Sequence, residues 1–292
     1  MTTNELVISD VDGTLWFNRT PSKGISVLDT LGFDSLGLEP TTLLLLLLAA
    51  LAAGWVDAVV GGGGMIQLPA VLMVPGLSPV QALAVNKLGS IFGTLTSAAT
   101  YLRRTPVDVR TVLPAASLAF VTSMGGALVA TALPEELFKP IIVLALLAVL
   151  VYTVFKSSLG ELTQLKHQGL KHLMVGLCIG ASIGFYDGLL GPGTGSFLMM
   201  AMVSLMGYSF LQATAQTKII NAATNLGALV LFAVAGQQVW ALGLLLGMAN
   251  MVGGYLGARM ALARGNGFIR WMMIAVVSAL IIKLGADILT AL

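Results

Sequence analysis

Charged residues are scarce in this sequence, and cysteine is nearly absent. Lys, Arg, Asp and Glu make up 10% of the 292 residues, hydrophobic residues make up 57%, and mean hydropathy is +0.93. Soluble domains carry about a quarter charged residues. Fifteen Lys and Arg with thirteen Asp and Glu are too few to cover a soluble core of this length. We therefore predict an all-α polytopic membrane protein that has the lipid bilayer as its partner.

The same scarcity argues against several other functions. The net charge of +2, with basic residues in short scattered clusters, gives no basic face, so we expect no nucleic-acid partner. The single cysteine, Cys178, excludes an intrachain disulfide, and its apolar surroundings indicate a small buried residue. His167 and His172 fall in a polar stretch typical of a solvated loop. We expect neither a metal site nor another cofactor.

Residues 1–40 lack an apolar run long enough to span a bilayer or to act as a secretory signal. We treat them as a polar N-terminal extension that forms a flexible or interfacial tail. Within it, DVDGTL from Asp10 to Leu15 resembles the nucleophile motif of haloacid-dehalogenase-type phosphatases. That chemistry needs a full α/β domain with further lysine and acidic motifs, whereas this chain becomes apolar at Thr41. We therefore expect no enzyme.

Long apolar runs dominate the rest of the chain. A bilayer crossing takes about 20 apolar residues. This rule predicts full spans at residues 41–60, 80–102, 109–132, 137–155, 173–190, 210–235, 239–263 and 268–289. Four spans precede a polar connector at 157–172 and four follow it, so the chain divides into transmembrane units at 41–156 and 173–292.

The two transmembrane units resemble each other. GWVDAVVGGGG from Gly54 aligns with GFYDGLLGPGT from Gly184 at an offset of 130, and QALAVNK from Gln81 aligns with QATAQTK from Gln212 at an offset of 131. Polar Asp, Gln and Lys recur in the same order, which hydrophobic composition alone does not explain. We predict two homologous repeats of the kind that builds many transporters.

After each glycine cluster comes an apolar run too short for an ordinary crossing. These runs are MIQLPAVLMVPGL and SFLMMAMVSLMG, each about 13 residues or roughly 20 Å as helix. Consecutive glycines destabilise helices, and free backbone groups at membrane depth must face protein or water. Each repeat is therefore predicted to hold four full spans and a glycine-broken or re-entrant half-helix beside a cavity.

The short runs leave two topologies open, with 8 to 10 crossings in total. If they dip in and return, the repeats are parallel, and the basic cluster of Arg259, Arg264 and Arg270 falls outside. If they cross, the repeats are inverted, and this cluster lies inside with the clusters at 103–110 and 156–171. Charge thus favours inverted repeats, although this choice sends the N-terminal extension outward without a cleavable signal.

Four charged residues interrupt the apolar segments: Asp57, Lys87, Asp187 and Lys218. Charges inside spans are costly and by default mark a pathway or a site. The spans that carry the lysines hold further polar side chains, namely Gln81, Asn86, Thr94, Ser97, Gln212, Thr217, Asn221 and Asn225. Donors beside fixed cations suit a small anion with several acceptor oxygens. Structural ion pairs and interhelical hydrogen bonds are the alternatives.

The glycine clusters form a second candidate element of the anion site. A half-helix that begins at membrane depth directs free N–H groups and its positive end at whatever lies before it. The candidate cradle comprises Gly61, Gly62, Gly63, Gly64, Gly191, Gly193, Thr194 and Gly195. Residues Gly89 and Gly93, like Gly253 and Gly257, have the GxxxG spacing of close helix packing instead.

Two sequence patterns together resemble the TauE/SafE sulfite exporter family. They are GWVDAVVGGGGMIQLPAVL followed by NK at Asn86, and GFYDGLLGPGTGSF followed by TKIINAATNLGAL. The resemblance extends from about Thr41 to Leu292 and leaves out the N-terminal extension. It implies a bacterial inner-membrane carrier, usually an exporter, for sulfur-containing anions such as sulfite, sulfoacetate or related C2 organosulfonates.

We therefore hypothesise a secondary transporter whose repeats alternate access to a midplane site. Lys87 and Lys218 would bind the anion with the neighbouring amides, while Asp57 and Asp187 would carry protons or pair with the lysines. An anion channel, or a carrier for another small carboxylate or oxyanion, is the alternative. The oligomeric state stays open, with a homodimer among the options.

Overall fold

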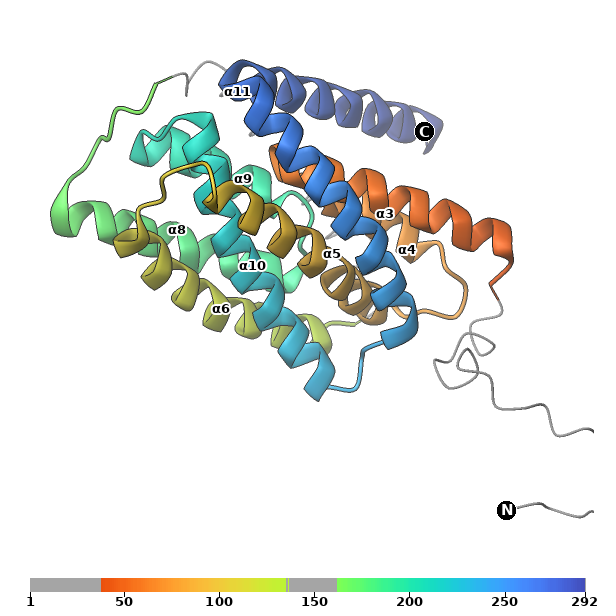
Figure 1. Cartoon of the computed structure of the whole chain (residues 1–292). Helices are drawn as coiled ribbons and strands as arrows, with labels where there is room; N and C mark the ends of the chain where they lie inside the picture. Colours follow the sequence, from red (N-terminus) through yellow and green to blue (C-terminus); the bar gives the residue numbers. More distant parts are fainter. Residues whose placement is uncertain (1–37, 135, 137–161, 292) are drawn as a thin grey trace, which may run out of the picture. The chain divides into compact units, whose positions relative to one another are not determined.

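The computed structural model describes residues 38–134, 136 and 162–291, with side chains described as far as Val276 (Figure 1). The phosphatase-like motif and the predicted span at 137–155 lie outside these residues. Within the described part of the chain, every regular element is helical: α3 (Pro40–Val60), α4 (Gly64–Leu72), α5 (Pro79–Leu102), α6 (Val109–Ala132), α8 (Gly169–Leu189), α9 (Thr194–Ala201), the π-helix η1 (Met202–Met206), α10 (Phe210–Val234) and α11 (Trp240–Ala291).

The helix ends follow local sequence chemistry. Helix α6 has the predicted bounds, and α3, α5, α8 and α10 differ from the predicted spans by four residues or fewer at either end. At the start of α5, Ser78 and Gln81 form a capping box in which each side chain accepts a hydrogen bond from the other residue's amide. At the end of α3, Gly61 takes a positive φ of 78°, which glycine adopts at little cost.

Helix α11 joins two predicted spans, 239–263 and 268–289, into one element that bends at a single residue. A straight helix of its 52 residues would be about 78 Å long, far more than the hydrocarbon core of about 30 Å. Gly265 interrupts it with a φ of 72° and a ψ of −163°. The two arms of α11 meet at an angle in Figure 1, so each arm can act as a separate span.

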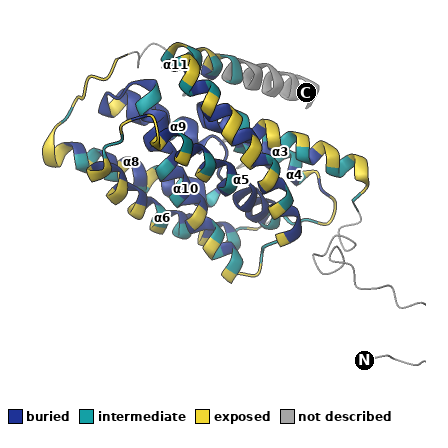
Figure 2. Cartoon of the chain, viewed as in Figure 1, coloured by how far each residue is buried: buried dark blue, intermediate teal, exposed yellow. Residues whose placement is uncertain are grey.

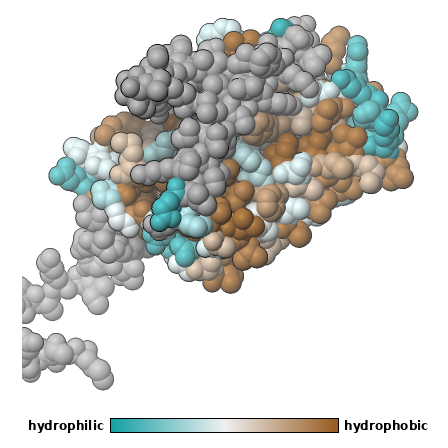
Figure 3. Space-filling view, turned by 180° about the vertical axis from the view of Figure 1, so that it is seen from behind, coloured by the Kyte–Doolittle hydropathy of each residue, from teal (hydrophilic) through white to brown (hydrophobic). Residues whose placement is uncertain are grey.

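The outside of the helix bundle is apolar and its inside holds polar groups. Leu45, Val121 and Leu128 are each more than half exposed, and apolar residues cover much of the surface in Figure 3. Lys87 and Asn250 are buried instead, and Figure 2 shows burial concentrated on the central helices. Among the described helices, α3, α6, α8, α10 and α11 are long and apolar enough to cross a membrane. This arrangement is that of a multi-pass membrane protein.

Glycines let α6 and α8 touch along their backbones. Gly180 packs against the backbone of Ala115, and two turns further on Gly188 packs against the carbonyl group of Ser123. The contacts advance by the same number of residues on both helices. Helices α6 and α8 therefore run parallel.

A second parallel contact joins α3 to the first arm of α11. Gly253 packs against the carbonyl group of Leu51, and Gly257, one turn later, packs against that of Trp55. This confirms the predicted role of the Gly253 and Gly257 spacing in close helix packing.

Helix α5 also runs parallel to the first arm of α11, since their contacts move from Leu88 with Gly243 to Gly93 with Gly254. The chain reverses direction between α5 and α6 and again between α10 and α11 (Figure 1). Helices α3, α5 and the first arm of α11 thus point one way, and α6, α8 and α10 point the other way.

Replacing Gly126 on α6 by alanine should destabilise the protein, because a methyl group there would overlap the carbonyl oxygen of Phe185 on α8. Gly125→Ala is the matched control, since its methyl group would lie 3.9 Å from the Phe185 ring, in ordinary contact. We expect the melting temperature in detergent to fall by roughly 5 °C or more for Gly126→Ala alone. Equal melting temperatures for the two variants would contradict the close packing of α6 on α8.

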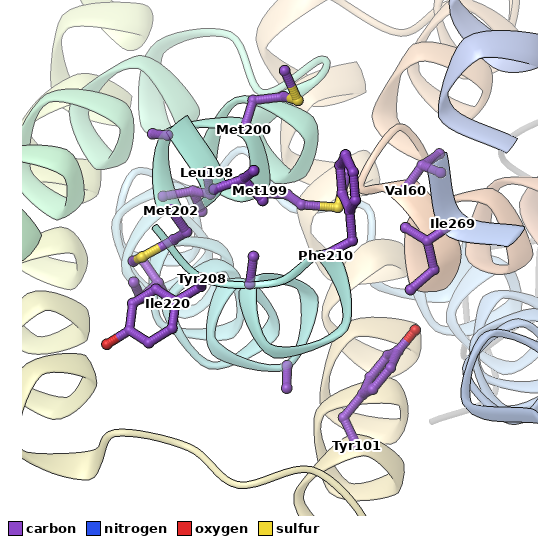
Figure 4. Close-up of a cluster of buried hydrophobic side chains, with 14 of the residues drawn as sticks. Val60, Tyr101, Leu198, Met199, Met200, Met202, Tyr208, Phe210, Ile220 and Ile269 are labelled. Atoms are coloured by element: carbon purple, nitrogen blue, oxygen red, sulfur yellow. The ribbon is translucent and has the colours of Figure 1, made fainter. Parts of the chain in front are cut away.

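The short helices α4 and α9, with η1 after α9, occupy the positions predicted for the half-helices. Leu198, Met199 and Met202 from α9 and η1 belong to a buried cluster that also contains Phe210 at the start of α10, and Figure 4 shows Met199 beside Phe210. Methionine side chains are unbranched and adaptable, so they fill the irregular space beside a broken helix. This cluster holds the second glycine break in place.

Two sequence predictions about single residues are wrong. Cys178 is exposed on α8 rather than buried, because it lines an open pocket of about 550 Å³ beside α9. His172 belongs to the first turn of α8 rather than to the connector, and its side chain is buried. The His172 Nε2 atom lies 2.7 Å from the hydroxyl group of Tyr208, which in turn donates to Asp108 Oδ2 at 3.3 Å. Burial raises the pKa of Tyr208 to about 12, so this hydroxyl group keeps its proton.

Candidate functional site

The four charged residues predicted from the sequence meet in the interior as two ion pairs. Lys87 Nζ lies 2.6 Å from Asp187 Oδ1, and Lys218 Nζ lies 2.8 Å from Asp57 Oδ2. Each side chain is almost fully buried. Each pair joins a lysine of one transmembrane unit to an aspartate of the other, so the pairs cross between the units.

The position of each aspartate in its helix explains why a lysine must lie beside it. Asp57 is in the last turn of α3, and Asp187 is in the last turn of α8. A helix C-terminus carries a partial negative charge, so a carboxylate there is unfavourable without a nearby cation. Lys218 contacts both the carboxylate and the backbone carbonyl group of Asp57. The lysines from α5 and α10 thus stabilise two helix ends at the same time.

Hydroxyl and amide side chains extend the two ion pairs. The Thr194 hydroxyl group donates to Asp187 Oδ1 at 2.6 Å, and Thr94 donates to Asp57 Oδ2 at 3.5 Å. Asn225 donates to Thr94 Oγ1 at 3.4 Å. An anion that replaced the carboxylates would lie within reach of these hydroxyl and amide donors.

The two glycine breaks lie directly against each other. The Ser196 amide and hydroxyl groups donate to the carbonyl oxygens of Gly61 and Val60, at 3.1 and 2.7 Å. A side chain at Gly61 would overlap the backbone of Gly195. Within the described part of the chain, the amide groups of Gly64 and Gly195 donate to no acceptor. These two amides are the free N–H groups that the half-helices offer at this depth.

A small cavity lies between the ion pairs and the glycine breaks. It is lined by Asp57, Gly61, Gly64, Asn86, Lys87, Ser90, Asp187, Gly191, Thr194, Gly195, Asn221 and Asn225. Its volume of about 20 Å³ is little more than one water molecule needs. The Asn86 Oδ1 and Asp187 Oδ2 atoms are buried without a partner among the described residues. The arrangement is therefore closed, and an anion of several atoms must separate the pairs to enter.

The sequence-predicted residues divide into those that the structure gathers and those that it does not. Lys218 joins the site through Asp57, whereas Gly62, Gly63, Gly193, Ser97 and Thr217 do not line the cavity. Gln81 and Gln212 lie at the N-terminal caps of α5 and α10. The sequence already indicated these helix caps, because a serine precedes each glutamine by three residues.

One cavity residue, Ser90, was missed by the sequence analysis. Serine inside an apolar helix most often bonds to its own backbone, so its identity alone gave little indication. Its position three residues after Lys87 places it on the same helix face, and this spacing could have identified it.

The apolar exterior and the buried ion pairs at two broken helices define a multi-pass membrane protein with a closed central polar site. The sequence model described as Sulfite exporter TauE/SafE matches residues 46–284. The chain belongs to this family of membrane transporters, as the sequence resemblance predicted.

Three relatives illustrate the family match. "Probable membrane transporter protein ORF9" of a Sinorhizobium species is 39% identical over 80% of this chain and 89% of its own. "Probable membrane transporter protein YfcA" of Escherichia coli K12 is 34% identical over 80% and 86%. A "Probable membrane transporter protein" of Haemophilus influenzae is 35% identical over 76% and 86%. No solved structure shows significant similarity to this chain.

Proposed function

We propose that the chain is a secondary transporter of a small sulfur-containing anion, such as sulfite, sulfoacetate or a related organosulfonate, in the bacterial inner membrane. The crossed ion pairs carry this proposal, because each unit neutralises the lysine of the other. An anion bound between the units can take the place of both carboxylates at Lys87 and Lys218. Cargo binding then breaks the contacts that hold the units together, which links occupancy to alternating access.

We also propose that residues 41–156 and 173–292 are inverted repeats with ten crossings. Helices α3 and α8, which begin the two repeats, run in opposite directions. Thr94 and Asn225 are equivalent positions at the offset of 131 and are hydrogen-bonded to each other, as expected near a two-fold axis. In this arrangement, movement of one repeat against the other would open the central site to each side of the membrane in turn.

The basic clusters support the inverted topology independently. Arg103 at the end of α5 and Arg259 on the first arm of α11 line one pocket. They therefore share one side of the bundle, as the positive-inside rule requires of cytoplasmic clusters. Parallel repeats would place them on opposite sides of the membrane.

The proposed anion site consists of Lys87, Lys218, Asn86, Asn221, Asn225, Thr194 and the free amide groups of Gly64 and Gly195. Ammonium, amide and hydroxyl donors around one centre match the several acceptor oxygens of a sulfite or sulfonate group. Glycine lets an oxyanion approach the backbone without obstruction by Cβ. The same chemistry would accept another small oxyanion or carboxylate, so such compounds belong in the test.

Protons enter the cycle through the two aspartates. When the anion occupies the lysines, Asp57 and Asp187 lose their counter-ions in an apolar interior, where unpaired charge is costly. Proton uptake by the carboxylates removes that cost, so we propose that cargo and protons bind together. The outward direction of transport rests on the description of the matched family.

A thermal-shift screen of the detergent-purified protein tests the proposal. The probes are sulfite, sulfate, thiosulfate, sulfoacetate, taurine, acetate and phosphate, on wild type and on Asp57→Asn/Lys218→Met. We expect one sulfur-containing anion to raise the melting temperature of wild type by mass action and to have no effect on Asp57→Asn/Lys218→Met, which lacks the lysine but leaves no unpaired buried carboxylate. Stabilisation of both proteins alike would place the anion elsewhere. Stabilisation by acetate alone would overturn the assignment of a sulfur-containing cargo.

Counterflow in liposomes then separates a carrier from a channel, because only a carrier exchanges labelled cargo for unlabelled cargo across the membrane. The closed cavity of about 20 Å³ favours the carrier, since a conducting pore needs a continuous path.

A further inference from the structure

We propose that a pocket between α5 and α11 binds the phosphate headgroup of an anionic phospholipid. The pocket has a volume of about 150 Å³ and is lined by Thr100, Arg103, Arg104, Tyr255, Arg259 and Leu262. Half of these residues are arginines, and none is acidic. The pocket is separate from the central cavity, with which it shares no lining residue.

The three arginines lack anionic partners within the described part of the chain. No carboxylate there lies within ion-pair distance of Arg103, Arg104 or Arg259. Positive charges gathered in one pocket repel each other. An anion bound among them removes this repulsion, and guanidinium groups match phosphate oxygens with paired N–H donors. The pocket is therefore complementary to a phosphate group.

One of the arginines is already oriented. Arg259 Nη1 lies 2.9 Å from the hydroxyl group of Tyr255, and the guanidinium group lies 5.3 Å from the centre of the Tyr255 ring. A side chain that is held before binding loses less conformational freedom when the ligand arrives. This preorganisation distinguishes Arg259 from a basic residue that serves only to orient the chain in the membrane.

The surroundings favour a lipid over free phosphate. Leu102, Val252 and Leu256, on the same two helices, are 50%, 47% and 49% exposed. A phosphate group at the arginines would leave acyl chains free to lie along these apolar side chains. Basic pockets between transmembrane helices on the cytoplasmic side suit the headgroups of anionic lipids. The lipid would connect α5 to α11 and so bridge the two transmembrane units.

The test titrates dioleoyl phosphatidylglycerol into the full chain in detergent and follows the melting temperature, with bound lipid counted by native mass spectrometry. Dioleoyl phosphatidylcholine and inorganic phosphate are the comparison ligands. The site variant is Arg103→Gln/Arg259→Gln. The matched control is Arg110→Gln/Arg264→Gln, which removes two arginines that do not line the pocket.

We expect phosphatidylglycerol to stabilise wild type and the control variant, while phosphatidylcholine and inorganic phosphate do not. The site variant should need about tenfold or more lipid for the same effect. An equal loss of stabilisation by phosphatidylglycerol in both double variants would overturn the proposed pocket site and indicate attraction to diffuse surface charge. Equal stabilisation by inorganic phosphate would overturn the lipid assignment.

Two further variants keep the outcome interpretable. Tyr255→Phe retains every arginine but removes the hydrogen bond that orients Arg259, and it should also weaken phosphatidylglycerol binding, even if the double site variant folds poorly. Unchanged binding by Tyr255→Phe would count against the preorganised site. Asp57→Asn/Lys218→Met, which removes the proposed anion-binding lysine together with its buried partner, should retain the lipid effect, so failure of the proposed transport function leaves this test intact.

Discussion

The double variant Asp57→Asn/Lys218→Met should fold and yet fail to transport, whereas Lys218→Met alone should be severely destabilised. Removing only the lysine leaves the Asp57 carboxylate buried without a partner, which costs about 3–5 kcal/mol in comparable buried pairs. Replacing both partners by neutral residues of similar size removes the charge problem and restores much of the stability.

A transport assay distinguishes an anion-binding role of Lys218 from a purely structural ion pair. If Lys218 binds the anion, flux of labelled sulfite or sulfoacetate into liposomes stays at background in the double variant, despite its recovered melting temperature. Flux near the wild-type level would show that the pair only joins α3 to α10. Lys166→Met is the control, because Lys166 donates to the Ser204 carbonyl oxygen away from the cavity. We expect it to transport normally.

Gly61→Ala should abolish transport and strongly lower stability, while Gly76→Ala should do neither to the same extent. Both glycines have a positive φ, 78° for Gly61 and 81° for Gly76. An alanine in this conformation costs about 1–2 kcal/mol. Only at Gly61 would the added methyl group also overlap a backbone, that of Gly195, since no atom lies within 4 Å of the position at Gly76.

The comparison therefore isolates the contact between the two glycine breaks from backbone strain. Melting temperature and liposome flux are measured for both variants. A similar loss of melting temperature and flux in Gly61→Ala and Gly76→Ala would mean that backbone strain alone accounts for the effect. A much larger loss of melting temperature and flux in Gly61→Ala would show that transport requires contact between the two glycine breaks.

Within the described part of the chain, the sequence was sufficient to identify the long helices and the polar residues among them. Apolar runs of the right length predicted α6 to the residue, because span length is set by bilayer thickness. Buried charge is costly enough that Asp57 and Lys218 stood out without any structure. The family resemblance added the transporter class, which the sequence model and the relatives confirm.

Tertiary packing decided what the sequence could not. Nothing in the spacing of Lys87 and Asp57 within one unit indicates that each binds its partner in the other unit, because the crossing depends on how the units pack. His172 lies in a polar stretch, yet it is buried by Tyr208 from a distant part of the chain. Gln81 was predicted to bind the anion because polar residues inside spans often mark a site. Its position three residues after Ser78 is instead that of a helix cap.

The exposed position of Cys178 gives the unmodified protein a built-in reporter. It is the one cysteine in the sequence, and it lines an open pocket beside α8, the helix that carries Asp187. Any thiol-reactive fluorophore or spin label that reaches this thiol therefore marks a single place without prior substitution. Spectra recorded with and without the transported anion can then follow how the surroundings of α8 change during the cycle, in the native sequence.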